Sequence, residues 1–282
     1  MTRRTGRAAE DGASGPGAPG RRTAPGPTRE ARRKAPRTDG SARPGLLDRL
    51  LPPPCVLCGR GLAPGAAPVC GLCWGRLPRI PRPHCPRCGA TRVLDLAGPG
   101  GCAECAAWPE GLAAAGSPCL MEGGASDLVH ALKYGGWFAL AEPMGRAMAP
   151  HARRLAGGTP HALEPVPLPP ARLRERGFNQ AALLAGSLGR ELGWPVGASL
   201  ARMGSRRRQV RLGRDDRRDN VRRAFFPAED APRPPDLPVL VVDDVLTTGA
   251  TAAACASVLE AAGRRVAGAV VFARALQAVG NG

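Results

Sequence analysis

Residues 239–251, with the sequence VLVVDDVLTTGAT, constrain the fold of this chain more than any other segment. Four consecutive apolar residues, three of them β-branched, are typical of a strand that is covered on both faces of a parallel sheet. Asp243 and Asp244 then fall at the carboxyl end of the strand Val239–Val242, and open α/β sheets bind ligands at that edge. We expect a helix from Thr251 to about Ala262, followed by a last strand at Val266–Phe272.

The turn between this strand and the helix suits a phosphate. It comprises Thr247, Thr248, Gly249, Ala250 and Thr251. Its small residues let backbone N–H groups approach an anion, and the positive end of the helix dipole points to the same place. Carboxylates can accept hydrogen bonds from sugar hydroxyls, so the segment predicts a site for a ribose 5-phosphate. A Walker B strand also ends in acid, but it requires a glycine-rich loop ending in Gly-Lys. Neither lysine of the chain, Lys34 or Lys133, follows a glycine.

Eight of the ten cysteines form four C-x-x-C units. The units are Cys55/Cys58, Cys70/Cys73, Cys85/Cys88 and Cys102/Cys105. Two such units complete a tetrahedral Cys₄ zinc site, so the pattern predicts one or two structural Zn²⁺ ions in a zinc-ribbon domain. So few large side chains cannot form a core that folds alone, whereas a structural zinc supplies roughly 10–16 kcal/mol. Sequential and cross-braced pairing both fit, and short loop closure favours sequential pairing. Cys119 and Cys255 lack partners at ligand spacing, and we expect them to be small buried apolar residues.

Composition divides the chain into three parts. Residues 1–45 carry eleven Arg or Lys against four Asp or Glu and almost no large apolar residue, which predicts a disordered basic tail. Residues 46–110 hold the cysteine units, and residues 111–276 have an α/β pattern. In this last part we expect helices at Ser126–Lys133, Ala139–Leu155 and Asn179–Leu192, a strand at Leu163–Leu168 and a mobile loop at Arg206–Asn220.

The net charge of +17 favours polyanionic partners, although an arginine-rich composition is also typical of a GC-rich genome. No apolar run is long enough for membrane insertion, and no signal peptide follows the first arginines. We therefore expect a cytoplasmic protein, in which cysteines bind metal rather than form disulfides. His84 is expected at the surface.

A proline-rich run leads into a block of arginines at residues 172–176, close to a strand end and a helix start. Each guanidinium can grip two oxygens, so Arg172 and Arg176 are candidates for holding a pyrophosphate; a solvated basic turn is the alternative.

The order of these motifs resembles one family. The cysteine-rich domain, Leu132–Gly135 (LKYG), Arg176–Gln180 (RGFNQ) and residues 239–251 follow one another as in ComF-type competence proteins, and the last segment resembles the phosphoribosyl-pyrophosphate (PRPP) motif of type I phosphoribosyltransferases. The resemblance implies the fold of those enzymes, a Rossmann-like parallel sheet flanked by helices. It also implies PRPP bound with Mg²⁺, and a role in DNA uptake, with the DNA-uptake machinery as a partner, or in nucleotide metabolism.

The resemblance assigns roles to residues. Asp243 and Asp244 would contact the ribose hydroxyls, and residues 247–251 would hold the 5-phosphate. A closing loop at Arg206–Asn220 would neutralise the leaving pyrophosphate. The cations that would contribute to it are Arg207, Arg208 and Arg217, while Lys133 and Tyr134 would form another edge of the pocket. No segment identifies the acceptor.

Two other functions remain open from the sequence. In one, the zinc units and arginines bind single-stranded DNA and the transferase fold is a non-catalytic scaffold. The scarcity of aromatic residues (one Tyr, four Trp and five Phe) weakens that hypothesis, because stacking carries such binding. In the other, the protein binds PRPP without chemistry, since a fold alone does not prove catalysis.

Overall fold

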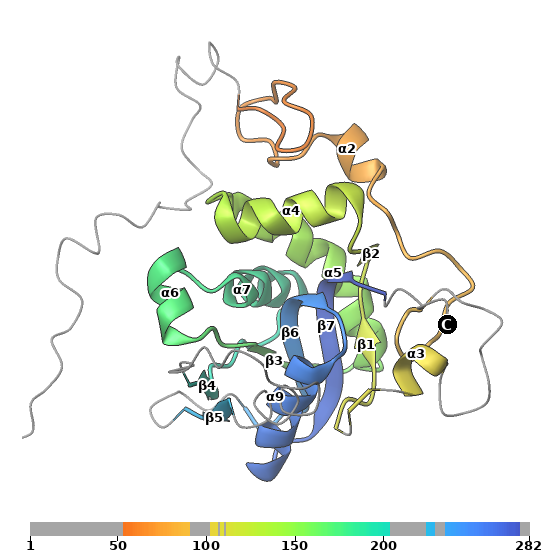
Figure 1. Cartoon of the computed structure of the whole chain (residues 1–282), viewed down its shortest axis with the longest axis vertical. Helices are drawn as coiled ribbons and strands as arrows, with labels where there is room; N and C mark the ends of the chain where they lie inside the picture. The colour runs from red at the N-terminus through yellow and green to blue at the C-terminus, as the bar shows by residue number, and fades with distance from the viewer. Residues whose placement is uncertain are drawn as a thin grey trace, which may run out of the picture. The chain divides into compact units, whose positions relative to one another are not determined.

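The computed structural model describes residues 53–90, 102–106, 108–109, 111–203, 224–228 and 235–276. They belong to one compact unit, Pro44–Gly282 (Figure 1). The expected disordered tail at residues 1–45 and the expected loop at Arg206–Asn220 lie outside the described residues. None of the helices in the described ranges combines the length and apolar character needed to cross a membrane.

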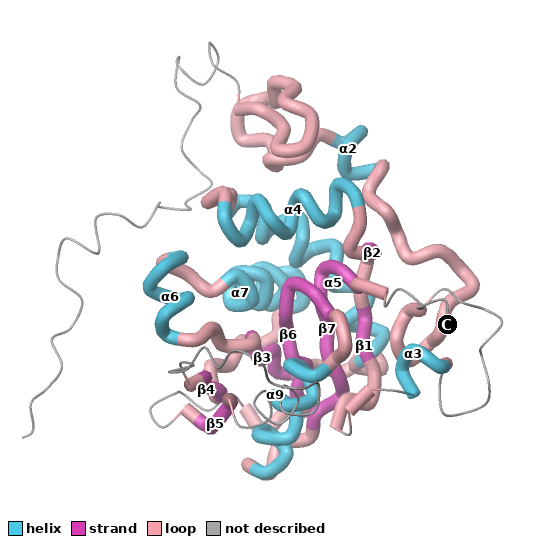
Figure 2. Tube along the Cα trace, viewed as in Figure 1, coloured by secondary structure: helices cyan, strands magenta, loops and turns pink. Residues whose placement is uncertain are grey.

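The centre of the unit is a parallel sheet (Figure 2). Its strands are β1 (Ala115–Gly116), β2 (Cys119–Leu120), β3 (Ala162–Pro165), β6 (Val239–Leu246) and β7 (Val266–Arg274). They follow the order β1-β7-β6-β3, and β2 pairs with the far end of β7. A separate antiparallel pair, β4 (Leu200–Arg202) and β5 (Phe225–Pro227), lies outside this sheet. The predicted α/β fold with a parallel sheet is confirmed.

Strand β6 is buried on both faces, which explains its run of apolar residues. Leu240 and Val242 belong to one apolar cluster, with residues of helices α4 (Gly123–Tyr134), α5 (Ala141–Leu155) and α7 (Gln180–Leu192). Val239 and Val241 belong to a second cluster, with residues of α9 (Ala250–Ala261). Because successive strand residues point to opposite faces, helices cover both sides of the sheet.

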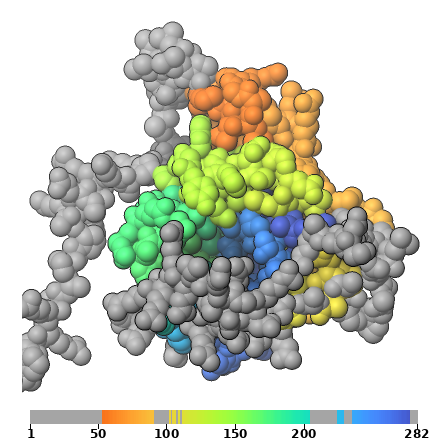
Figure 3. All heavy atoms as spheres, viewed as in Figure 1, coloured from red at the N-terminus to blue at the C-terminus, as the bar shows by residue number. Residues whose placement is uncertain are grey.

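Shorter elements complete the structure. They are α2 (Gly71–Gly75), α3 (Ala103–Ala106), the 3₁₀ helix η3 (Phe138–Leu140) and α6 (Pro170–Arg176). We call the segment around Cys55, Cys58, Cys70 and Cys73 the first zinc ribbon, and the segment around Cys85, Cys88, Cys102 and Cys105 the second. The first ribbon contributes Cys55, Val69 and Leu77 to the same apolar cluster as α4. In the space-filling view, α4 accordingly lies between this ribbon and the sheet (Figure 3).

Two expectations about β3 and β6 were wrong in their limits. The strand expected at Leu163–Leu168 ends at Pro165, since the alternating prolines that follow cannot donate ladder hydrogen bonds. The chain instead enters α6, a helix that we did not anticipate, with Pro170 in its first turn. Strand β6 continues to Leu246, so Asp243 and Asp244 lie within the strand and not after it. The four helices that were predicted, α4, α5, α7 and α9, lie where expected, with shifts of up to three residues at their ends.

Helices α5 and α7 pack at very close range through Gly145. A Cβ atom on Gly145 would lie 2.6 Å from Ser187 Cβ and 3.0 Å from the backbone nitrogen of Leu188. Gly145 belongs to α5. Gly186, on the partner helix α7, is less crowded: a Cβ there would meet only the end of the Arg190 side chain, at 3.7 Å. The close approach of the two helices therefore requires glycine at 145 and not at 186.

Alanine at these two positions should have opposite effects on stability. Gly145→Ala forces the helices apart and should lower the free energy of unfolding by about 1–3 kcal/mol. Gly186→Ala should raise it by about 0.5–1 kcal/mol, because alanine loses less backbone entropy in a helix. Urea denaturation of both variants measures the difference, and equal stabilities would contradict the packing described here.

Candidate functional site

A cavity of about 470 Å³ opens beside the end of β6. Polar and charged residues from six helices and strands and from the turn before α9 line it: Lys133, Arg172, Arg176, Gln180, Arg202, Asp243, Asp244, Thr247 and Thr251. The structure thus brings together the acidic pair, two residues of the predicted phosphate loop and three of the six predicted pyrophosphate cations. Arg207, Arg208 and Arg217 lie outside the described residues.

The two aspartates have different surroundings because they point to opposite faces of β6. Asp244 is 3% exposed and forms an ion pair with Lys133 of α4, with Nζ and Oδ2 2.7 Å apart. Asp243 Oδ1 accepts the backbone N–H of Asp244 at 2.8 Å. Burial and the adjacent Asp244 charge raise the pKa of Asp243 well above its usual value, and the Asp244 N–H and Lys133 oppose the shift only in part. Asp243 therefore takes up a proton more readily than an ordinary carboxyl.

The turn at Thr247–Thr251 is held by tight packing and by a buried arginine. Gly249 has φ +78°, and a Cβ there would lie 2.7 Å from Leu112 Cδ2. Arg274, only 1% exposed, donates to the Thr247 carbonyl at 2.7 Å. The same guanidinium lies 3.4 Å from Glu104 Oε2. Glu104 is on α3, between the cysteines Cys102 and Cys105 of the second cluster. The second zinc ribbon therefore contacts the predicted phosphate loop through Arg274.

The RGFNQ segment joins α6 to α7: Arg176 is the last residue of α6 and Gln180 the first residue of α7. Gly177 ends α6 in the left-handed conformation, with φ +77°. Asn179 caps α7 by accepting the N–H of Ala181 at 3.0 Å, and its amide donates to the Val166 carbonyl at 3.0 Å. This arrangement aims the arginine of the segment at the cavity.

The two cavity arginines of α6, Arg172 and Arg176, differ in their partners. Arg176 donates to Gln180 Oε1 at 3.0 Å and to the Tyr134 hydroxyl at 3.1 Å, and its guanidinium stacks on the Tyr134 ring. Tyr134 itself is 66% exposed and does not line the cavity. Among the described residues, Arg172 forms an ion pair with Glu175 alone, and both side chains of that pair are exposed.

Arg202 of β4 is a cavity residue that the sequence analysis missed. Burial lowers the pKa of its guanidinium, and the nearby Cys255 and Asp243 oppose the shift. Its strand is anchored by Glu164 of β3, a buried carboxyl that accepts the N–H of Leu200 at 3.1 Å. No sequence motif includes Arg202. It reaches the cavity because β4 lies beside β3 in the folded chain.

The eight paired cysteines form two compact clusters. Within Cys55, Cys58, Cys70 and Cys73, and within Cys85, Cys88, Cys102 and Cys105, the ligand atoms lie within 4.8 Å of one another. Both clusters fit a structural Zn²⁺ in tetrahedral geometry, and the pairing is sequential, as favoured. Cys119 and Cys255 are unpaired and buried, as expected.

Backbone N–H groups favour thiolates in both clusters. Burial raises the pKa of Cys55, but N–H groups led by that of Cys70 outweigh it and lower the pKa to about 6. The same balance, led by the N–H of Cys88, lowers the pKa of Cys85 to about 7. A thiolate is the form that binds zinc, so the backbone prepares Cys55 and Cys85 as ligands. The neighbouring Cys70 thiol instead raises the pKa of Cys73, and burial raises the pKa of Cys88.

His84 retains part of its exposure to solvent, as expected. It is partly buried, and its Nδ1 lies 3.2 Å from the Pro81 carbonyl. Of the two tryptophans in this part of the chain, Trp108 packs within the second apolar cluster and Trp74 lies near Phe272 of β7.

The ion pair between Lys133 and Asp244 should show as coupling in a double-mutant cycle. Lys133→Met leaves the buried Asp244 carboxylate without its counter-charge and should lower the free energy of unfolding by about 1–3 kcal/mol. Adding Asp244→Asn should recover part of that loss, because no buried charge is then left unpaired. Denaturant unfolding of the two single variants and the double variant measures the coupling; additive effects would contradict the pair.

Removal of one zinc ligand should have unequal effects in the two ribbons. Each of Cys58→Ser and Cys105→Ser should reduce the zinc content from two ions per chain to one, measured by elemental analysis. Cys105 is fully buried and Cys58 is exposed, so Cys105→Ser should lower the melting temperature more. A folded wild-type chain that purifies without zinc would contradict both assignments.

Comparison with known proteins agrees with this organisation. Residues 46–106 match the family model of the double zinc ribbon domain. The chain is 32% identical over 218 residues to DNA utilization protein YhgH of Escherichia coli strain K12, covering 73% of this chain and 89% of the relative. It is 41% identical over 93 residues to competence protein F of Haemophilus influenzae, covering 33% of this chain and 41% of the relative. This chain therefore belongs to the ComF family, together with competence protein F and DNA utilization protein YhgH.

Proposed function

We propose that the cavity beside β6 binds PRPP. The observation that carries the proposal is the convergence of an acidic pair, a glycine-containing turn at a helix start and three arginines with a lysine on one cavity. A ribose bearing a phosphate at one end and a pyrophosphate at the other needs hydroxyl acceptors between two anion sites. The described cavity offers these groups in that combination.

The residues divide into three roles under this proposal. Asp243 and Asp244 accept hydrogen bonds from the ribose hydroxyls, and residues Thr247–Thr251 receive the 5-phosphate at the positive end of α9. The pyrophosphate lies against cations that grip its oxygens. These are Lys133, Arg172, Arg176 and Arg202. We propose that Arg207, Arg208 and Arg217, which lie outside the described residues, join them.

Mg²⁺ would accompany the pyrophosphate. Asp243 is the residue suited to it, because among the described residues only Oδ1 of its carboxylate accepts a backbone hydrogen bond, and carboxylate oxygens are preferred ligands of Mg²⁺. The ion would neutralise phosphate charge. Asp244, held by Lys133, is less available for this role.

Phosphoribosyl transfer is the reaction class that this site supports. A nucleophile forms a bond to the anomeric carbon of the ribose while the bond to pyrophosphate breaks, and the arginines stabilise the charge that the leaving group carries away. Binding of PRPP without turnover is the second form of the same proposal. Release of pyrophosphate separates the two forms.

We propose that PRPP binding by this chain serves the handling of DNA. The relatives are named for DNA utilization and for competence, and the family similarity extends over most of the chain. DNA uptake during competence is accordingly the process in which we propose that this chain acts. Single-stranded DNA binding on a non-catalytic transferase scaffold is the rival function.

Calorimetric titration of PRPP with Mg²⁺ tests the proposal. The wild-type chain should bind with micromolar affinity, and Asp243→Asn/Asp244→Asn should lose binding because the ribose hydroxyls lose their charged acceptors. The control Glu122→Gln/Asp127→Asn removes the same charge from two exposed residues near the start of α4 and should bind as the wild type does. Absence of binding by the wild type would overturn the proposal and favour the scaffold.

A further inference from the structure

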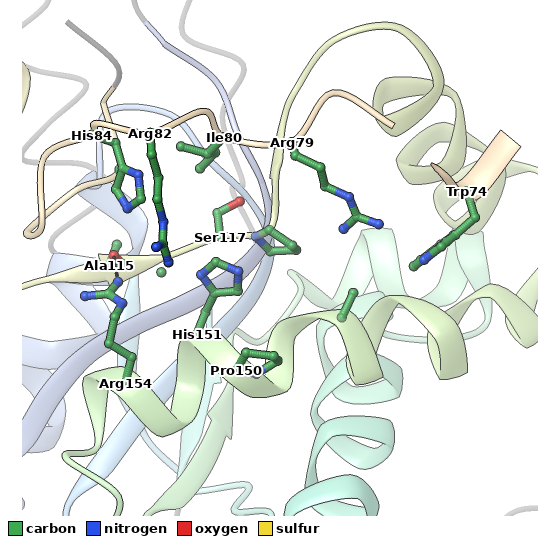
Figure 4. Close-up of a pocket in the computed structure, with 14 residues that line it drawn as sticks. Trp74, Arg79, Ile80, Arg82, His84, Ala115, Ser117, Pro150, His151 and Arg154 are labelled. Carbon is green, nitrogen blue, oxygen red and sulfur yellow. Dashed lines mark hydrogen bonds between the residues drawn. The ribbon is translucent and has the colours of Figure 1, made fainter. Parts of the chain in front are cut away.

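A second cavity, of about 430 Å³, lies where the linker between the zinc ribbons faces β1 and α5. Figure 4 shows Arg82 and His84 reaching from the linker toward His151 and Arg154, which project from α5. Arg79 lies farther along the linker with its guanidinium over the ring of Trp74, 5.5 Å from the centroid. Among the described residues, this cavity shares no lining residue with the one beside β6.

The side chains that line this cavity include basic residues but no acidic residue to balance their charge. They include three arginines and two histidines but no aspartate or glutamate. Within the described ranges, none of the ion pairs involves Arg79, Arg82 or Arg154. Like charges gathered without a counter-charge raise the free energy of the unliganded protein, and a bound anion removes that cost.

The pKa of His151, on α5, is affected by these positive charges. Burial lowers the pKa of His151 to about 4, and the charges of Arg154, His84 and Arg79 add to the shift. His151 is therefore neutral near pH 7 and keeps one ring N–H that can donate a hydrogen bond.

Two of the three arginines are held in place by the protein itself. Arg154 donates to the carbonyls of Pro86, at 3.0 Å, and Ala115, at 3.4 Å. Arg79 donates to Cys119 Sγ at 3.8 Å. The Arg82 guanidinium has no hydrogen-bond partner among the described residues, and it is exposed at the mouth of the cavity. Arg82 therefore has its full set of donors available for a ligand.

We propose that this basic cavity is a second anion site, which takes a phosphate group between Arg82, Arg154 and His151. Guanidinium groups match phosphate oxygens in a two-pronged geometry, and a neutral imidazole adds a single donor. The phosphate can belong to a free small phosphate or to a phosphodiester of a single-stranded nucleic acid. The proposal does not depend on PRPP binding at β6.

Paired arginine substitutions test the site with two probes. Calorimetry with sodium pyrophosphate and fluorescence anisotropy with a labelled oligothymidylate are measured for the wild type, Arg82→Gln and Arg82→Gln/Arg154→Gln. The controls Arg76→Gln and Arg76→Gln/Arg153→Gln remove equal charge from exposed residues of the first ribbon and of α5 that do not line the cavity. Arg82→Gln should weaken at least one probe about tenfold, because a charge-assisted hydrogen bond is lost, and Arg76→Gln should leave both probes nearly unchanged.

The two probes identify the source of the phosphate. Selective weakening of oligothymidylate, with a shallower dependence on salt, assigns the site to a nucleic-acid strand. Loss of one pyrophosphate site from the stoichiometry assigns it to a free phosphate. Equal losses in the Arg82 and Arg76 variants, or no binding of either probe by the wild type, would overturn the proposal. Unaltered PRPP binding by Arg82→Gln would keep this result separate from the test at β6.

Discussion

The pairing of β6 with β3 on one side and β7 on the other is the interaction on which the rest of the structure depends. Val239–Val242 form ladder hydrogen bonds on both edges and are covered on both faces. Any shift of this strand by one residue would turn Asp243 and Asp244 to the wrong faces, because side chains alternate along a strand. Burial of the four apolar residues thus determines where both carboxyls point.

The zinc ribbons are structural partners of the α/β part and not an independent appendage. The first ribbon contributes Leu77 to the apolar cluster that includes α4. The second contributes Trp108 to the cluster beneath α9, and Glu104 lies against Arg274. The ribbons contain few large side chains, so metal binding supplies stability that their own apolar burial cannot.

The predictions from sequence succeeded where one local pattern was decisive. The C-x-x-C spacing led to both zinc clusters, and the run at Val239 led to the central strand, since each depends on neighbours in the chain. Arg202 and the second cavity were not predicted, because strand pairing and the fold of the linker bring distant residues together. No helix was predicted at Pro170–Arg176, where the arginine block was considered only as a pyrophosphate site or a basic turn, although proline is well suited to a first helical turn.

Arg274 connects the second zinc ribbon to the turn before α9. Its guanidinium is enclosed between the carbonyl of Thr247 and the carboxylate of Glu104, so the turn before α9 is braced from behind by the segment that carries Cys102 and Cys105. Because the segment of Glu104 contains two of the four ligands of the second cluster, we expect loss of that metal ion to weaken this contact. Under the proposed function, zinc binding would therefore affect not only how much of the protein is folded but also how well the proposed phosphate turn is preorganised beside the cavity.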